Sequence, residues 1–263
     1  MTILDKIADY ARIRVAKDKE ETGMDQMKEL AFRCGRGGGS AFYGAIAKPG
    51  ISFICEVKKA SPSKGIIDPV FDYRQTAIEY EAAGADAVSC LTEPKWFLGS
   101  DRIFREIRDC IHIPMLRKDF IVEEYQIYQA RYMQADCVLL ICALLDQDTL
   151  AKYLEICRSL GLAALVEAHD AAQIRLAVEA GAEMIGVNNR NLKDFSVNLE
   201  NAFALRDIIP KGCLYVAESG IAAPTDAGIL AKAGADAILV GEAMMRAGNK
   251  QAFLNDMRNA VKR

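Results

Sequence analysis

The stretch FICEVKKASPSKG, residues Phe53–Gly65, contains an apolar run, a charged pair and a turn, in that order. Residues two apart in a strand point to the same face, so Glu56 and Lys58 would project together while Cys55 and Val57 point the other way. An isolated pair of this kind is equally well explained as an ion pair at the rim of a sheet. Its meaning therefore depends on the rest of the chain.

Apolar runs of strand length recur after residue 50, and helical patterns separate them. The eight runs are Ile51–Val57, Ala87–Leu91, Ile113–Leu116, Cys137–Ile141, Ala163–Val166, Met184–Val187, Leu214–Ala217 and Ala237–Val240. The helical patterns are Tyr73–Ala83, Ser100–Cys110, Glu123–Met133, Asp148–Leu160, Ala171–Ala180, Leu199–Asp207, Ala223–Ala233 and a last one near Gln251–Lys262. Such alternation predicts a parallel sheet with helices packed on it.

The joints between helices and strands resemble one another. Ala83–Asp86, Ala180–Glu183 and Ala233–Asp236 each place a glycine where a helix should stop and an acidic residue before the next apolar run. A glycine there can adopt the positive φ that turns the chain into the strand. Eight such units predict a closed (β/α)8 TIM barrel, and the count makes the alternative, an open doubly wound sheet, fit less well.

The N-terminal part precedes the first predicted strand. Residues 1–30 have a helical pattern, so we expect residues 1–50 to form an N-terminal helical extension that lies over one mouth of the barrel. Arg36–Ser40 contains three consecutive glycines. Such a run can cradle a phosphate, but no strand precedes it and no clear helix follows, so a flexible linker is predicted. We expect residues 1–263 to form a single domain.

Composition narrows the classes of function. The 263 residues are 51% hydrophobic and 26% charged with a net charge of −3, which indicates a soluble core and gives no basic field for nucleic acid. No run approaches about 18 apolar residues, and Asp5 and Lys6 interrupt any signal peptide, so we expect a cytoplasmic protein without a membrane partner. The eight cysteines are scattered without a C-x-x-C pair, which favours reduced thiols over disulfides or a zinc site.

Polar and charged residues follow most of the apolar runs, and the carboxyl ends of parallel strands meet at one mouth of a barrel. These residues are Glu56 and Lys58, Thr92 and Glu93, Arg117–Asp119, Glu167, Asn188–Arg190, and Glu218 and Ser219. Two lysines and three glutamates from different strands would then share one cleft, which simple solvated strand ends would not require. The pattern favours an active site.

Glycines follow the last two runs, in Ser219–Ile221 and Gly241–Ala243, and a short helical piece follows at Ala243–Ala247. Glycine lets backbone N–H groups approach a phosphate closely, and a helix N-terminus adds positive potential. After strands seven and eight of a barrel, Gly220, Gly241 and the backbone of Glu242 therefore favour a phosphorylated small-molecule substrate.

Six motifs, in order along residues 51–247, carry a family resemblance. They are EVKKASPSKG (Glu56–Gly65), LTEPKWFLGS (Leu91–Ser100), RKDFI (Arg117–Ile121), LVEAHD (Leu165–Asp170), GVNNRNL (Gly186–Leu192) and AESGI (Ala217–Ile221). Together they resemble indole-3-glycerol phosphate synthase, a (β/α)8 barrel of tryptophan biosynthesis. The resemblance implies a monofunctional lyase that closes the indole ring of 1-(2-carboxyphenylamino)-1-deoxyribulose 5-phosphate, with loss of CO2 and water and without metal or organic cofactor.

The resemblance also implies roles. Lys118 would be the general acid and Glu167 its acid/base partner, with Glu56, Lys58 and Asn188 in the same catalytic set. The implied substrate-binding residues are Ser61, Phe97, Phe120, Arg190, Glu218 and Ser219, of which Ser61 and Arg190 hold the anthranilate end with Asn188. Ring closure needs an acid that protonates the ketone oxygen, and Lys118 suits that step. Lys58 could instead bind the phosphate or act as a second acid, and the sequence leaves this open.

The pKa of Lys118 depends on opposing neighbours. Lys58 and Arg190 should lower it and the three glutamates should raise it, and the sequence does not give the balance.

His169 follows Glu167 closely, but it stands where the next helix begins, so we expect a structural turn role for it. His112 is expected at the surface, and Trp96 to fill space under its loop.

Two positions depart from the family pattern. Lys59 stands where the family most often has Arg, and Glu242 where it often has Ser. An acid at the phosphate corner would repel the phosphate unless its side chain turns to solvent.

Two other functions fit the sequence less well. A barrel like phosphoribosylanthranilate isomerase would use a cysteine at the end of the first strand, whereas Cys55 is expected to face outward. A non-catalytic barrel subunit would not need both Lys118 and Glu167. No fused domain is expected, and the predicted state is a monomer or weak homo-oligomer.

Overall fold

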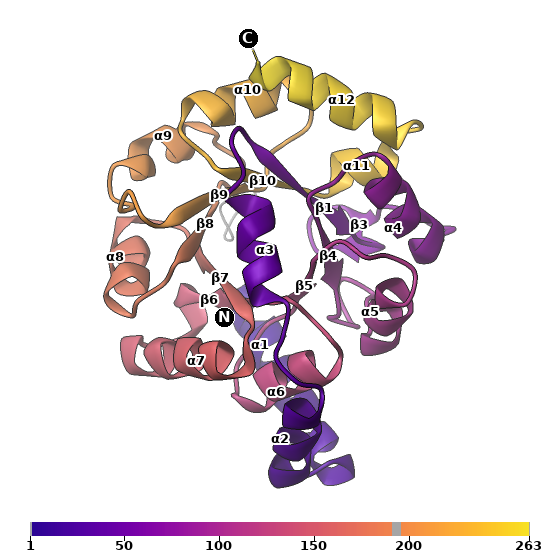
Figure 1. The fold of residues 1–263 in the computed structure, drawn as a ribbon, viewed down its shortest axis with the longest axis vertical. Helices are drawn as coiled ribbons and strands as arrows, with labels where there is room; N and C mark the ends of the chain where they lie inside the picture. The colour runs from indigo at the N-terminus through magenta and orange to yellow at the C-terminus, as the bar shows by residue number, and fades with distance from the viewer. Residues whose placement is uncertain (1, 191–195, 263) are drawn as a thin grey trace.

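The computed structural model describes residues 2–190 and 196–262, which form a closed barrel of eight parallel strands surrounded by helices (Figure 1). The barrel strands are β1 (Ser52–Val57), β4 (Ala87–Leu91), β5 (Met115–Lys118), β6 (Cys137–Ile141), β7 (Ala163–Ala168), β8 (Met184–Asn188), β9 (Leu214–Glu218) and β10 (Ala237–Val240). Each pairs with the next along the chain, and β10 pairs with β1 to close the ring. The predicted TIM barrel is therefore confirmed, and the open sheet is excluded.

Helices cover the outside of the ring between successive strands. They are α4 (Tyr73–Ala82), α5 (Asp101–Arg108), α6 (Tyr125–Tyr132), α7 (Gln147–Leu160), α8 (Ala171–Glu179), α9 (Glu200–Arg206), α10 (Pro224–Lys232), α11 (Glu242–Arg246) and α12 (Lys250–Val261). A 3-10 turn, η1 (Cys142–Leu144), follows β6, and a small hairpin of β2 (Ala60–Ser61) and β3 (Gly65–Ile66) follows β1. None of the helices in the described part of the chain has both the length and the apolar character needed to span a bilayer.

Strand ends differ from prediction where polar residues continue the ladder. The third strand was predicted at Ile113–Leu116 but runs from Met115 to Lys118, because Pro114 lacks the N–H that a strand interior needs. Glu167 likewise lies within its strand, since its Cα pairs with those of both neighbouring strands. These extensions place the charged side chains inside the mouth of the barrel rather than in loops.

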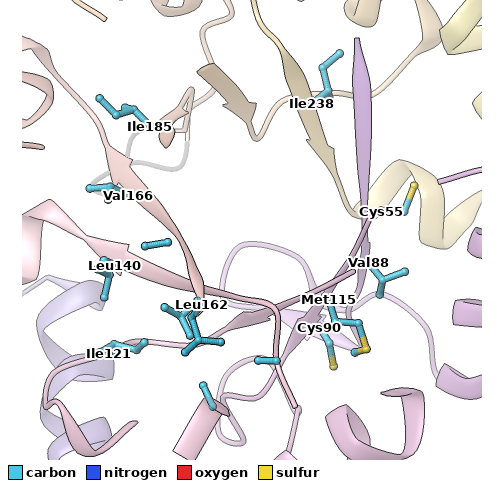
Figure 2. Packing of buried hydrophobic residues seen from close by; sticks show 14 of the residues in the cluster. Cys55, Val88, Cys90, Met115, Ile121, Leu140, Leu162, Val166, Ile185 and Ile238 are labelled. Atoms are coloured by element: carbon cyan, nitrogen blue, oxygen red, sulfur yellow. The ribbon is translucent and has the colours of Figure 1, made fainter. Parts of the chain in front are cut away.

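Side chains alternate between the inside of the barrel and the layer under the helices. Cys55, Val88 and Ile238 belong to the outer layer (Figure 2), as the strand period predicts for Cys55. Ile54 and Leu165 belong to the inner layer. All eight cysteines are free thiols, and six of them are buried.

The N-terminal segment covers both ends of the barrel. It contains α1 (Ile3–Glu21), α2 (Met24–Arg33) and α3 (Gly39–Ile46). Thr2 and Asp5 form a capping box at the start of α1, and the first turns of α1 line the pocket at the carboxyl ends of the strands. At the opposite end, α3 crosses the ring (Figure 1), where Phe42 and Ile46 are fully buried against the inner layer.

The expectation of a flexible linker at Arg36–Ser40 is wrong. Gly37 N donates to Leu160 O and Gly39 N donates to Gly161 O, both at 2.9 Å. A Cβ built on Gly39 would stand 2.4 Å from Ala163 N, a contact that real Cβ atoms do not make. The glycines are therefore needed for close approach of two backbones, and they dock α3 onto the start of β7.

We expect Gly39→Ala to destabilise the protein, because its Cβ collides with backbone atoms rather than with a flexible side chain. Overpacking of this kind costs about 1–3 kcal/mol. Gly44→Ala on the same helix is the control, since no atom lies within 4 Å of its Cβ position and alanine favours a helix by about 0.5–1 kcal/mol. In thermal melts, Gly39→Ala should lower the Tm and Gly44→Ala should raise it. An unchanged Tm in Gly39→Ala would contradict the close docking of α3 on the start of β7.

Candidate active site

A cavity of about 540 Å³ opens at the carboxyl ends of the strands, and all eight barrel strands contribute to its lining. The catalytic, substrate-binding and phosphate-binding residues that the sequence indicated all line it: Glu56, Lys58, Ser61, Phe97, Lys118, Phe120, Glu167, Asn188, Arg190, Glu218, Ser219, Gly220, Gly241 and Glu242. Four other polar residues predicted at the strand ends are absent from the lining: Thr92, Glu93, Arg117 and Asn189. Asn191 and Leu192, which end the GVNNRNL motif, lie outside the described residues. The strand ends therefore bring these side chains to one place, as the barrel requires.

Lys118 lies among carboxylates. Its Nζ is 2.9 Å from Glu218 Oε2 and 3.6 Å from Glu167 Oε2, and its side chain is only 14% exposed. Burial by itself would lower the pKa of Lys118, but the charges of Glu218, Glu167 and Glu56 outweigh burial and raise that pKa above its usual value. The balance that the sequence left open thus favours the ammonium form, which can donate a proton.

Glu167 and Glu218 have unlike environments. Burial tends to raise the pKa of Glu167, but Lys118, His169 and Asn188 together lower it below its usual value. Burial is also the main influence on Glu218, and repulsion by Glu167 adds to it, so the pKa of Glu218 is raised despite Lys118. Titratable groups whose pKa values are pushed apart are typical of acid/base pairs.

Gly186 on β8 makes room for Glu218. A Cβ at Gly186 would stand 2.0 Å from Glu218 Oε1. That buried oxygen has no hydrogen-bond partner among the described residues. The carboxylate therefore lies over the glycine with one oxygen on Lys118 and the other free to accept.

Glu56 and Lys58 form an ion pair on the same face of the first strand and its extension, as the period of two predicts. Their side chains are 5% and 16% exposed. A Cβ at Gly241 would stand 2.4 Å from Glu56 Oε1 and 2.9 Å from Lys58 Nζ. Because Gly241 has no side chain, it leaves the space that the ion pair occupies. Gly241 directly follows β10, so the pair lies beside the corner formed by the ends of β9 and β10.

At that corner the chain turns sharply after β9. Ser219 and Gly220 both have left-handed φ values, 66° and 84°, and the former is uncommon for a residue with a side chain. The Glu242 side chain at this corner is 31% exposed. Its carboxylate binds Arg246 at 3.1 Å and Lys64 at 3.8 Å. Two cations therefore offset the negative charge of Glu242, which stands where the family often has Ser.

Aromatic side chains line the other side of the cavity. The rings of Phe97 and Phe120 lie 5.9 Å apart with a 38° angle between their planes, which suits contact with a flat ring. Trp96 packs edge-on against Tyr10 of α1 at 5.7 Å and is absent from the cavity lining. The ammonium of Lys59 lies 5.9 Å from the centre of the Phe71 ring, also away from the cavity.

Two contacts of the site were missed by sequence reasoning. His169 Nε2 lies 3.1 Å from Glu167 Oε1, and its position two residues after Glu167 was the available signal. Arg14 of α1 binds the carboxylate of Asp119 through two hydrogen bonds of 2.7 and 3.1 Å. No local signal links these two residues, because 105 positions separate them.

Asp119 fixes the segment that carries Lys118 and Phe120. Its carboxylate has no exposed surface and accepts from the Thr92 hydroxyl at 2.7 Å as well as from Arg14. Burial tends to raise the pKa of Asp119, but Arg14 and Arg117 lower it below its usual value. The α1 helix is therefore held over the mouth by a buried ionic contact.

None of the described residues forms a group of three or more His, Cys, Asp or Glu side chains arranged to hold a metal ion. The carboxylates of the cavity are instead bound by Lys58, Lys118 and His169.

Comparisons with known proteins give a family and a fold. The sequence model of a family described as indole-3-glycerol phosphate synthase matches residues 4–257. A protein of that name from Ruminiclostridium cellulolyticum is 48% identical over 259 residues, 98% of this chain and 100% of the relative. A second, from Endomicrobium trichonymphae, is 46% identical over 257 residues, 98% of this chain and 100% of the relative.

Solved structures with low sequence identity share the fold. A thiamine phosphate pyrophosphorylase from Pyrococcus furiosus has a TM-score of 0.60 at 18% identity, covering 81% of this chain and 96% of that one. A 3-hexulose-6-phosphate synthase from Salmonella typhimurium has a TM-score of 0.65 at 14% identity, covering 81% and 99%. At these identities the likeness concerns the barrel alone.

Arg14→Met should destabilise the protein at neutral pH by about 2–3 kcal/mol, because Asp119 loses a charged partner while buried. The native pKa of Asp119 is depressed, so the stability it contributes is present above its unfolded pKa of about 3.9 and is lost as pH falls through the folded value. Urea unfolding at several pH values should show that the difference in free energy of unfolding between Arg14→Met and the parent protein becomes smaller at acidic pH. Arg12→Met, which breaks an exposed pair with Asp9, is the control and should cost about 0–0.5 kcal/mol; equal losses would contradict the buried anchor.

Proposed function

This chain belongs to the indole-3-glycerol phosphate synthase family, and on that premise we propose which of its side chains carry each step of the reaction. It is an enzyme that closes the indole ring of 1-(2-carboxyphenylamino)-1-deoxyribulose 5-phosphate, releasing CO2 and water, in tryptophan biosynthesis. The observation that carries the assignment of residues is the position of Lys118, held between two buried carboxylates in the cavity.

The substrate spans the cavity from the glycine corner to the aromatic side. Its phosphate accepts hydrogen bonds from the backbone at Gly220, Gly241 and Glu242, with Lys58 adding positive charge. In support, Gly220, Gly241 and Glu242 line the cavity, and the Glu242 side chain is already bound to cations.

The anthranilate ring lies against Phe97 and Phe120. Asn188, Arg190 and Ser61 hold its carboxylate end, and Ser219 completes the wall with Glu218. The separation of the aromatic pair from the glycine corner across one cavity supports this orientation.

Ring closure begins when Lys118 gives a proton to the ketone oxygen. The carbonyl carbon becomes electrophilic, and the ring carbon that bears the carboxylate attacks it. The raised pKa of Lys118 keeps the donor charged until the substrate oxygen develops negative charge. Loss of CO2 then restores the aromatic ring.

Dehydration needs an acid for the departing hydroxyl and a base for the proton on the adjacent carbon. Glu167 is the base, and the lowered pKa of its carboxyl supports an ionised side chain at neutral pH. Lys58 or Lys118 protonates the hydroxyl, and Glu56 orients Lys58 through their ion pair.

The isomerase-like alternative would need a cysteine in the cavity at the end of the first strand. Cys55 is buried in the outer layer and does not line the cavity. We further propose that the enzyme works in the cytoplasm as a monomer or weak homo-oligomer, since all eight barrel strands of one chain contribute to the lining of the cavity.

We expect Lys118→Met to reduce turnover by at least about 10²-fold, the range of a lost general acid, while substrate binding stays measurable. Indole fluorescence after mixing purified protein with the substrate, without added metal, reports turnover, and quenching of protein fluorescence reports binding. Lys211→Met, at an exposed lysine, is the matched control. A near-normal kcat in Lys118→Met would remove Lys118 from the mechanism, whereas an inactive parent protein would contradict the activity itself.

Gly241→Ala should lower kcat/KM by roughly tenfold or more, because its Cβ would displace both Glu56 and Lys58 and a small misplacement of catalytic groups is costly. Gly248→Ala is the control, since nothing lies within 4 Å of its Cβ position. Steady-state kinetics of both variants, with circular dichroism to check folding, decide the matter. Equal kinetics in the two variants would contradict the assigned role of this corner.

A further inference from the structure

Glu93 is one of the polar residues predicted at the strand ends, but it does not line the cavity. It lies two residues beyond the end of β4, in the β4–α5 loop of residues 92–100, and it is fully buried. No step of the proposed reaction uses it. Because a buried carboxylate is costly unless its oxygens are bonded, its partners indicate what it does.

The carboxylate of Glu93 accepts hydrogen bonds from three consecutive backbone N–H groups. Lys95 N donates to Oε1 at 2.9 Å, and Trp96 N and Phe97 N donate to Oε2 at 2.7 and 3.0 Å. Pro94 has no N–H to offer. Both oxygens are thus bonded within the part of the loop that ends at Phe97, whose side chain lines the cavity.

The rest of the β4–α5 loop follows a tight course. Gly99 N donates to Glu93 O at 2.8 Å, and a Cβ on Gly99 would stand 2.1 Å from Leu91 O. Leu98 has a left-handed φ of 55°, which is uncommon for a residue with a side chain. The direction of the Phe97 ring therefore depends on the bonds that hold the backbone on either side of it.

A second buried acid holds the neighbouring ring in the same way. Phe120 N donates to Asp119 Oδ1 at 2.8 Å, and the hydroxyl of Thr92 donates to Asp119 Oδ2 at 2.7 Å. The rings of Phe97 and Phe120 lie 5.9 Å apart. Each ring of this pair thus has a buried carboxylate bonded to its own backbone N–H.

Arg14 of α1 brings positive charge to this region. Burial tends to lower its pKa, but Asp119, Asp101 and Glu93 outweigh burial and raise that pKa above its usual value. The charged guanidinium offsets part of the cost of burying the carboxylate of Glu93.

We propose that Glu93 is a positioning residue that holds the Phe97 ring against the anthranilate ring of the substrate, an inference that rests on the ring-binding role proposed for Phe97. Since Glu93 does not line the cavity, it acts through the loop and not on the reacting atoms. The ring is contacted in the bound substrate and in the transition state alike. Loss of such uniform binding raises KM and leaves kcat unchanged.

Glu93→Gln keeps the size of the side chain but replaces one oxygen by an amide nitrogen, which cannot accept. KM should rise about two- to tenfold, the range of one lost aromatic contact, and kcat should stay within about twofold of the parent value. Glu81→Gln is the matched control. The carboxylate of Glu81 accepts from His112 N and Ile113 N at 2.7 and 3.0 Å, in a loop that does not line the cavity, so KM should match that of the parent protein.

Two further measurements test whether Glu93 acts through the loop and through Phe97. Phe97→Leu should raise KM, and Glu93→Gln added to it should raise KM no further, because residues that act through one another are not additive. Trp96 is the only tryptophan of the chain, and it packs edge-on against Tyr10. Without substrate, its emission should therefore move to longer wavelength in Glu93→Gln and stay unchanged in Glu81→Gln.

A KM equal to that of the parent protein in Glu93→Gln overturns the inference. So does a loss confined to kcat, an unshifted Trp96 emission, or effects on KM that multiply in the double variant. If Glu93→Gln fails to fold, Glu93→Asp, whose side chain is one methylene shorter, takes its place in every comparison. An unchanged KM in Phe97→Leu refutes the ring-binding role of Phe97 itself, whereas a raised KM there with an unaffected Glu93→Gln refutes the positioning alone.

Discussion

The site depends on one ammonium group that holds buried carboxylates together. Glu56, Lys118, Glu167 and Glu218 come from β1, β5, β7 and β9, which alternate around the ring. Alternate strands of such a barrel contribute one layer of four side chains, so these residues form a single layer that is charged where the layers below are apolar. Buried charges of one sign cost several kcal/mol each unless they are paired. Lys118, with contacts to two of the three acids, offsets much of this cost, as Lys58 does for Glu56, and closure of the ring brings the layer together.

Glycines determine how much room that layer leaves. Gly186 and Gly241 stand where a Cβ would meet Glu218 and the Glu56–Lys58 pair, so the charged side chains extend over positions that carry none. Helices of the N-terminal segment then close the barrel at both ends. α3 fills the end opposite the site with Phe42 and Ile46, while α1 is tied through Arg14 to Asp119, the residue between Lys118 and Phe120. Stability and site geometry therefore share the same contacts.

Much of this arrangement could be predicted from local sequence, because periodicity fixes which face a strand residue takes. That rule placed Glu56 with Lys58 and turned Cys55 outward, and the count of repeating units gave the barrel. The failures have a common physical origin in contacts between distant segments. The run Gly37–Gly39 looked flexible since nothing local shows that its backbone docks on the residues before β7. The Arg14–Asp119 bond is likewise invisible in either segment alone, and the balance of charges on Lys118 depends on distances that only the closed ring sets.

With the roles proposed for Lys118 and Glu167, the unequal carboxylates around Lys118 couple the acid and base steps. Glu167 receives hydrogen bonds from its neighbours and so favours its ionised form, while Glu218 has a buried oxygen without a partner among the described residues. When Lys118 gives its proton to the substrate, the attraction that offset the repulsion between these carboxylates disappears. The pKa of each must then rise, which makes Glu167 a stronger base at the moment when a proton has to leave the substrate. In this proposed mechanism, proton donation by the lysine prepares the carboxylate for the following step.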